Sequence, residues 1–165
     1  MVAQTYNVLF LCTGNSARSI MAEALLSRRG SPTFRAFSAG SKPKGQVHPM
    51  SLDTLGRNNF RTDHFRSKSW NEFTSPDSPK LDFIITVCSN AANETCPVIP
   101  GKPLNAHWDI DDPARSFNSD DEQQRAFETV FIELDRRIQL LVELPIDKMD
   151  KVVLQEHLRE MSDPN

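Results

Sequence analysis

Short apolar runs alternate with amphipathic stretches along this chain. Four runs, at residues 7–11, 34–39, 81–87 and 106–108, have the length and the apolar, β-branched or aromatic content of buried strands. Helical periodicity follows at residues 18–29, where Met21, Ala24 and Leu25 share one face, and a short helix begins at Pro49 and ends near residues 56–59. Residues 67–80 predict an irregular helix followed by a loop.

The second half of the chain predicts a long closing helix. Over residues 120–144 the apolar positions keep the spacing of one helical face, namely Phe127, Val130, Phe131, Leu134, Ile138 and Leu141. Pro145 ends this helix. Residues 146–161 predict one more helix, with Met149, Val153, Leu154, Leu158 and Met161 on its apolar side.

Strands that alternate with helices indicate an α/β fold with a parallel sheet covered on both faces, and ligands in such folds bind beyond the carboxyl ends of the strands. A chain of 165 residues corresponds to about one domain. We therefore predict a domain at residues 1–145 and a helical extension of the same domain at residues 146–165.

Composition narrows the class of protein. The chain is 38% hydrophobic and 25% charged, with a net charge of -3. No run of Lys and Arg predicts a nucleic-acid or membrane-surface partner. The apolar stretch at residues 8–11 is far shorter than a signal-peptide core or the roughly twenty residues of a membrane span. Three cysteines, an odd number, favour chemistry over disulfide stapling. We expect a cytoplasmic protein.

The strongest chemical signal joins the first predicted strand to the first predicted helix. It is the oxyanion cradle, defined here as residues 12–19: Cys12, Thr13, Gly14, Asn15, Ser16, Ala17, Arg18 and Ser19. Backbone N–H groups at a helix N-terminus attract anions. Gly14 and Asn15 tolerate positive φ, and Arg18 can grip two oxygens at once. The segment predicts a site for a tetrahedral oxyanion.

Cys12 is the expected nucleophile of this site. The positive field of the cradle predicts a pKa below the usual value of about 8.5, and hence a thiolate. Ser19 is placed to donate to the sulfur. The alternative is a buried cysteine that merely ends a strand.

Two further features are candidates for catalytic chemistry, one as an acid and one as a pair of redox thiols. In the run Asp111-Asp112-Pro113, a carboxylic acid on a stiffened loop could protonate a leaving oxygen, although acidic residues before proline are usually turn formers. Cys88 and Cys96 flank a polar segment without the spacing of a zinc site. They predict a redox relay, or else they are two small hydrophobic residues.

Residues 7–144 resemble the thioredoxin-coupled arsenate reductases of the low-molecular-weight protein tyrosine phosphatase fold. The shared landmarks are the strand, cradle and Met-Ala-Glu run at residues 8–23, then Ser38-Ala39-Gly40, Val87-Cys88, Cys96-Pro97 and His107-Trp108 leading to Asp111-Asp112-Pro113-Ala114. The resemblance implies a four-stranded parallel sheet with helices on both faces, to which this chain adds a C-terminal helix.

The resemblance also implies residue roles. Cys12 attacks arsenate, Arg18 holds the oxyanion, Asn15 shapes the loop, Ser19 stabilises the thiolate, and Asp112 helps water leave. Cys88 then attacks the Cys12 adduct and releases arsenite, and Cys96 forms a disulfide with Cys88 for an external reductant, either thioredoxin or glutaredoxin with glutathione. No cofactor is required.

The family's potassium site is altered in this chain. Asn15, Glu23 and Ser38 match three of its ligands, but Lys68 stands where the fourth, an aspartate, is expected. Either the Lys68 ammonium replaces the ion, or Lys68 is a solvated surface lysine. We therefore expect no bound metal.

A phosphatase acting on phosphotyrosine or small phosphate esters is the main alternative, because phosphate and arsenate share the cradle chemistry. Two features distinguish the chain from such phosphatases: the position after the Asp-Pro pair, often aromatic in them, is Ala114, and they have no need for thiols at both Cys88 and Cys96. Ala17 leaves Cys12 without a second thiol in its own loop. A non-catalytic oxyanion-binding module is a further alternative, opposed by the presence of nucleophile, arginine and candidate acid together.

Overall fold

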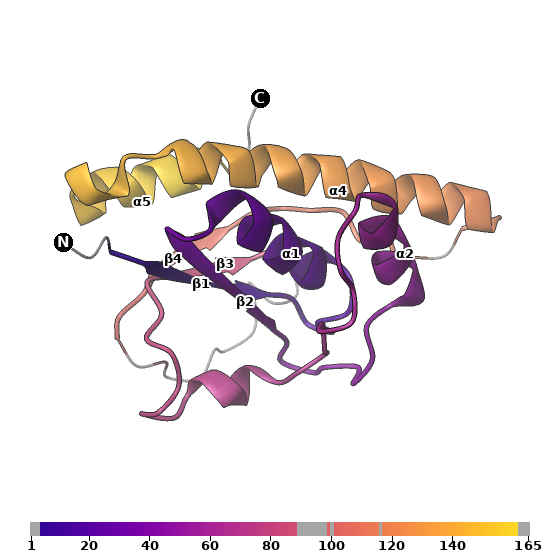
Figure 1. Cartoon of the computed structure of the whole chain (residues 1–165), viewed down its shortest axis with the longest axis horizontal. Helices are drawn as coiled ribbons and strands as arrows, with labels where there is room; N and C mark the ends of the chain where they lie inside the picture. Colours follow the sequence, from indigo (N-terminus) through magenta and orange to yellow (C-terminus); the bar gives the residue numbers. More distant parts are fainter. Residues whose placement is uncertain (1–3, 89–98, 100, 116, 162–165) are drawn as a thin grey trace.

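A four-stranded parallel sheet forms the centre of the molecule (Figure 1). The computed structural model describes residues 4–88, 99, 101–115 and 117–161. The strands are β1 (Tyr6–Leu11), β2 (Phe34–Ala39), β3 (Phe83–Thr86) and β4 (Leu104–His107), in the order β2-β1-β3-β4. The predicted parallel sheet is confirmed: β2 has its predicted bounds, and the ends of the other strands differ from the prediction by at most two residues.

The sheet register brings the ends of β1 and β3 together. Leu11 pairs with Thr86, and the Val87 N–H donates to the Leu11 carbonyl at 2.9 Å. Cys12 and Cys88 therefore follow neighbouring strands at the same edge of the sheet. Parallel strands place the residues that follow them in a common crevice, which is where ligands bind in this class of fold.

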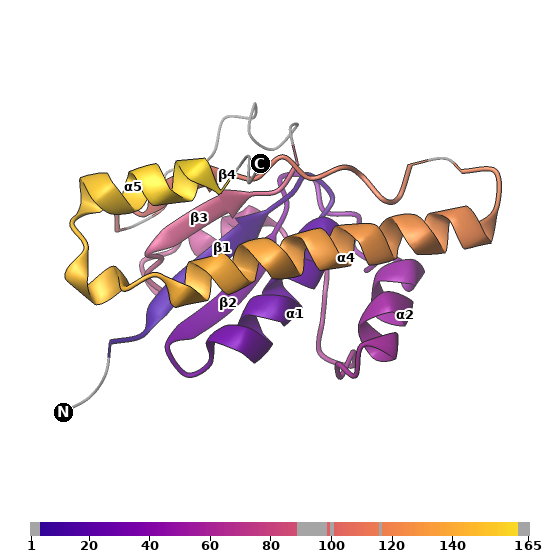
Figure 2. The ribbon, with the colours of Figure 1, turned by 90° about the horizontal axis from the view of Figure 1, so that it is seen from above.

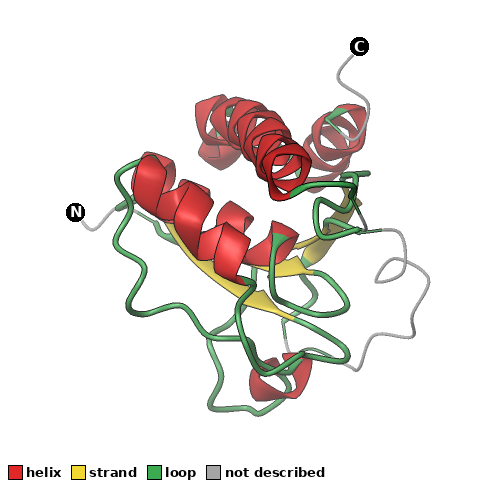
Figure 3. Cartoon of the chain, turned by 90° about the vertical axis from the view of Figure 1, so that its right-hand side faces the viewer, coloured by secondary structure: helices red, strands yellow, loops and turns green. Residues whose placement is uncertain are grey.

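Both faces of the sheet are covered, as predicted. The helices α1 (Arg18–Gly30), α2 (Pro49–Arg57), α4 (Asp120–Glu143) and α5 (Lys151–Glu160) lie on one face, as Figure 3 shows. The 3-10 helix η1 (Trp70–Phe73) lies on the other, where Phe73 packs against Leu9 and Ile84. The irregular helix predicted within residues 67–80 is limited to these four residues.

Helix α4 supplies much of the core. Its six predicted apolar positions are all buried, and it crosses α1 in Figure 2. The Ser119 side chain begins the helix by accepting from the Glu122 N–H at 3.2 Å. The apolar face and the side-chain cap at the first turn therefore both favour one long helix.

The single helix predicted at residues 146–161 is wrong, because the segment breaks into η2 (Ile146–Lys148) and α5. Met149 is extended, and Asp150 starts a new helix by accepting from the Val153 N–H at 2.9 Å. Val153, expected on the apolar side, is 41% exposed, whereas Leu154 and Leu158 are buried.

Helix α5 is joined to the rest of the chain through named contacts. The Gln155 side chain donates to the Asn105 carbonyl after the start of β4, and the buried Arg137 of α4 donates to the Met161 carbonyl. These bonds support the proposal that residues 146–165 extend the same domain. None of the described helices is long and apolar enough to cross a membrane.

Candidate active site

The oxyanion cradle occupies the turn between β1 and α1. Asn15 adopts φ +44°, as the curled loop was expected to require, whereas Gly14 is not among the positive-φ residues. The fully buried Asn15 side chain accepts from the Lys68 N–H at 2.9 Å and donates to Ser19 Oγ at 2.8 Å. These two bonds fix the left-handed residue, so the loop is shaped before any ligand arrives.

Gly40 lets β2 approach the cradle. A Cβ at this position would lie 2.5 Å from the Thr13 carbonyl oxygen and 2.7 Å from that of Cys12. Both neighbours are backbone atoms that cannot move aside cheaply. The Ser38-Ala39-Gly40 landmark therefore has a steric explanation that the sequence alone did not provide.

Arg18 faces the cradle from the first turn of α1. Its Nη1 donates to the Ile110 carbonyl at 2.9 Å, and its Nη2 lies 3.9 Å from Asp112 Oδ1. The buried Nε has no hydrogen-bond partner among the described residues. Helix α1 also begins without a side-chain cap. Donors at the helix start are thus left for an anion.

Cys12 and Cys88 lie together at the base of the cradle. Both cysteines are reduced, and Cys88 Sγ accepts from the Thr13 N–H at 3.3 Å. The hydrogen bond with Cys88 raises the pKa of Cys12, and burial adds to this, while Arg18 and the Gly14 N–H act in the opposite direction. The predicted lowering of the Cys12 pKa is therefore wrong for the unliganded dithiol, because a neighbouring thiol outweighs the positive field.

Asp112 is the carboxylate that reaches the cradle. It lines the same cavity as Cys12 and Arg18, whereas neither Asp109 nor Asp111 does. Its side chain is 50% exposed and accepts from the Ala114 N–H at 2.9 Å. The loop is anchored nearby by the buried side chains of Trp108 and Ile110. This geometry gives Asp112 both solvent contact and access to a bound anion.

The cavity between these groups is small. Its volume is about 190 Å³, below the roughly 300 Å³ at which pockets for drug-sized ligands begin. The described residues lining it are Cys12, Thr13, Gly14, Asn15, Ser16, Ala17, Arg18, Lys42, Lys44, Cys88, Asp112 and Ala114. A single tetrahedral oxyanion matches this size and the donors that face it.

Behind the cradle, Lys68 joins Glu23 and Ser38. Its Nζ lies 3.9 Å from Glu23 Oε1, which also accepts from Ser38 Oγ, and the Lys68 side chain is only 11% exposed. Burial raises the pKa of Glu23 and lowers that of Lys68.

These residues do not fit a bound potassium ion. The Asn15 oxygen already accepts from the Lys68 backbone, and the Lys68 ammonium stands beside the Glu23 carboxylate. A metal cation here would face a like charge at close range. Of the two alternatives for Lys68, the solvated surface lysine is wrong.

The structure brings most of the predicted site together. Cys12, residues 13–18, Cys88 and Asp112 share one cavity, while Ser19 is buried behind it and bonded to Asn15. Cys96 lies outside the described residues. Lys42 and Lys44 line the same cavity but are not among the predicted site residues; in the sequence their one signal is a spacing of two residues in the segment after Gly40.

Comparisons with known proteins identify relatives of this chain. Residues 7–153 match the family model described as low molecular weight phosphotyrosine protein phosphatase. The arsenate reductase of Bacillus licheniformis is 31% identical over 137 residues, covering 82% of this chain and 94% of that protein.

Solved structures show the same relationship. An arsenate reductase from Archaeoglobus fulgidus superimposes with a TM-score of 0.65 at 28% identity, covering 83% of this chain and 99% of that one. A thioredoxin-dependent arsenate reductase of Corynebacterium glutamicum gives 0.57 at 27% identity, over 86% of this chain and 65% of that one. The chain belongs to the low molecular weight phosphotyrosine protein phosphatase family.

Proposed function

We propose that this protein reduces arsenate to arsenite through a covalent adduct on Cys12 and a thiol relay. The observation that carries the proposal is the second thiol: Cys88 lies in hydrogen-bond contact with Cys12 inside an oxyanion site. Ester hydrolysis at a cysteine needs one thiol and water. Reduction needs two electrons, which a pair of adjacent thiols supplies.

The first step forms a sulfur–arsenic bond. Cys12 Sγ attacks the arsenic of a bound arsenate dianion while one As–O bond breaks. The thiol proton of Cys12 and a proton from Asp112 leave with that oxygen as water. Arg18 and the cradle amides hold the remaining oxygens. Asp112 lies 3.9 Å from Arg18, near enough for both to act on one small anion.

The second step moves electrons. Cys88 Sγ attacks Cys12 Sγ, the sulfur–arsenic bond breaks, and its electron pair leaves with arsenic, which falls from As(V) to As(III). The products are arsenite and a Cys12–Cys88 disulfide, and the Cys88 proton passes to the arsenite oxygens or to solvent. The contact between the two thiols supports this step, because the nucleophile begins beside its target.

Regeneration is assigned to Cys96 and an external thiol. In this proposal Cys96 attacks Cys88, which frees Cys12 and leaves a Cys88–Cys96 disulfide for thioredoxin or for glutaredoxin with glutathione. The relative named thioredoxin-dependent supports the first donor. A cycle that needs reduced thiols is suited to the reducing cytoplasm, the expected location.

Phosphatase activity is the second candidate function. The family model and the shared cradle support hydrolysis of phosphotyrosine or small phosphate esters by Cys12, Arg18 and Asp112. Such a reaction has no use for Cys88. We therefore expect it as a side activity.

One assay tests the proposal. Purified protein is supplied with arsenate and with thioredoxin and its reductase, glutaredoxin plus glutathione, or no donor, and arsenite is measured beside hydrolysis of an aryl phosphate. We expect catalytic arsenite formation with one donor, and its loss in Cys88→Ser while aryl phosphate hydrolysis survives. Hydrolysis without arsenite under any donor would assign the protein as a phosphatase.

A further inference from the structure

The segment after β2 runs along the outside of the oxyanion cradle. The Lys42 N–H donates to the Thr13 carbonyl at 2.9 Å, and the Lys44 N–H donates to the Gly14 carbonyl at 3.0 Å. In a trans peptide unit the carbonyl and the following N–H point in opposite directions. Because these two carbonyls are bonded to the outer segment, the N–H groups that follow them point the opposite way, toward the cavity.

The same two bonds direct both lysine side chains to the cavity. Lys42 and Lys44, which are separated by Pro43, both bond to the cradle through their backbone N–H groups. Both residues also line the cavity that contains Arg18. The Lys44 stem lies over Gly14, where an added Cβ would be 3.2 Å from Lys44 Cε. Attachment to the cradle thus limits where the two ammonium groups can go.

The described residues that line the cavity carry a net positive charge, whereas the whole chain carries a net negative charge. The chain carries a net charge of -3, yet among the described residues that line the cavity the charged side chains are Arg18, Lys42 and Lys44 on one side and Asp112 on the other. The ion pairs found among the described residues involve neither lysine. Their charges remain available to a ligand, and a cleft of one sign concentrates the opposite ion.

We propose that Lys42 and Lys44 form a cationic rim that captures the tetrahedral oxyanion in its dianionic form. The inference rests on the proposed function and adds the charge state of the substrate and two residues that select it. The rim acts on capture, because both lysines are exposed residues that line the cavity and neither takes part in the proposed bond changes. Arsenite is uncharged near neutral pH as arsenous acid, so the rim retains the substrate and releases the product.

The test measures binding of inorganic phosphate, which needs no turnover. Phosphate protection of Cys12 from iodoacetamide gives a dissociation constant for the wild type, for Lys42→Met and Lys44→Met, and for the double variant. Methionine keeps most of the apolar stem and removes the charge. At low ionic strength we expect roughly threefold weaker binding for each single variant and about tenfold for the double. The difference should shrink in high salt.

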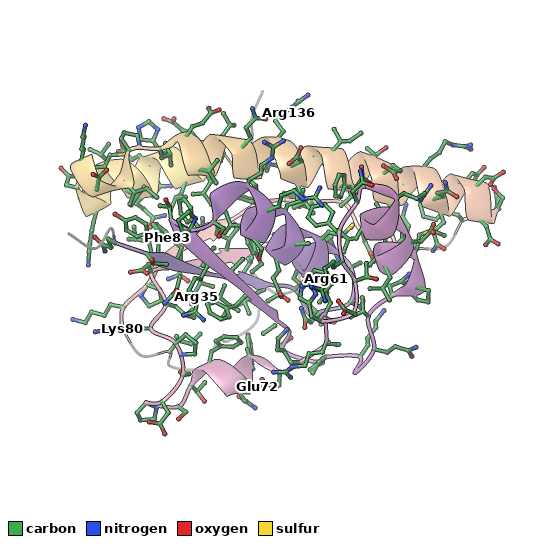
Figure 4. All side chains as sticks on the ribbon, viewed as in Figure 1. Arg35, Arg61, Glu72, Lys80, Phe83 and Arg136 are labelled. Carbon is green, nitrogen blue, oxygen red and sulfur yellow. The ribbon has the colours of Figure 1, made fainter. Side chains whose placement is uncertain are left out.

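Two controls isolate the rim. Lys80→Met removes the same charge just before β3, at the opposite end of the strands, where Figure 4 shows the side chain pointing away from the molecule. Lys42→Arg with Lys44→Arg restores the charges at the rim. We expect both controls to bind phosphate as the wild type does. For arsenate reduction by the double methionine variant, we expect a raised KM and a kcat within twofold of the wild-type value.

The outcomes separate the rim from the proposed function. Unchanged phosphate binding in the double methionine variant would overturn the rim, even if the protein reduces arsenate. An equal loss in Lys80→Met would also overturn it, since that is an effect of total charge. Weaker binding in the methionine variants at positions 42 and 44 but not in the two controls, in a protein that forms no arsenite, would support the rim and refute the reductase.

Discussion

The cradle and the loop that carries Asp112 meet at one anion site but are built differently. In the cradle, Asn15 and Ser19 are fully buried, and backbone bonds from the neighbouring segment hold the loop. The acid loop has buried anchors at Trp108 and Ile110, while Asp112 itself is half exposed. The cradle is thus built into the frame of the fold, whereas the carboxylate proposed as the proton donor lies on a surface that water reaches. Substitutions in the two regions should separate stability from activity.

The largest effect is expected at Gly40, which supports the cradle. Gly40→Ala places a Cβ within 2.7 Å of two backbone oxygens, so β2 or the cradle must shift. We expect a loss of stability of about 1–3 kcal/mol, as in overpacked sites, together with loss of phosphate binding. Thermal unfolding and Cys12 protection measure the two effects.

Gly56→Ala is the matched control, since a Cβ there meets nothing within 4 Å. Alanine in the α2 helix should leave binding unchanged and stabilise slightly, by about 0.5–1 kcal/mol. If both alanine variants behaved alike, the close approach at Gly40 would not be what supports the cradle.

The next largest effect concerns the acid loop. Asp112→Asn should lower kcat by about 10²- to 10⁴-fold, the usual contribution of a general acid, with no change in melting temperature. Asp111→Asn is the neighbouring control and should retain activity, because Asp111 does not line the cavity. Greater damage from Asp111→Asn would mean that the acid has been assigned to the wrong residue.

A moderate effect is expected on the titration of Cys12. The hydrogen bond with Cys88 is the largest cause of its raised pKa, so Cys88→Ser in a Cys96→Ser background should lower that pKa. At any pH below the wild-type pKa the variant then has the larger thiolate fraction, so Cys12 should alkylate faster. A rate profile against pH that is unchanged by the substitution would show that burial, rather than Cys88, controls the thiol.

The smallest effect is expected from exchanging the cation in solution. With the Lys68 ammonium beside Glu23, replacing potassium by a large organic cation at constant ionic strength should change kcat/KM less than about twofold. Specific activation by potassium would contradict the finding that this cluster does not fit the ion.

Local chemistry made the cradle predictable from the sequence. A strand, a tight turn and a helix start are adjacent in the chain, so the oxyanion site can be predicted from the continuous segment of residues 12–19. The six buried positions of α4 followed from their spacing in the same way. Long-range geometry was harder: the steric need for Gly40 and the lysine rim depend on segments more than twenty residues from the cradle.

Two errors have physical causes. The Cys12 pKa was expected to fall because only the positive field was considered, whereas Cys88 arrives from another strand and raises it. The prediction of a single C-terminal helix fails because the apolar spacing continues across Asp150, although that side chain caps a new helix.

The most direct test of the account is the disulfide formed in a single turnover. Cys96→Ser, fully reduced and given excess arsenate without any donor, should release one arsenite per chain, and peptide mapping should find Cys12 joined to Cys88. The contact between the two thiols predicts this product. Both thiols still free after the incubation, with arsenate bound and no arsenite released, would contradict the relay.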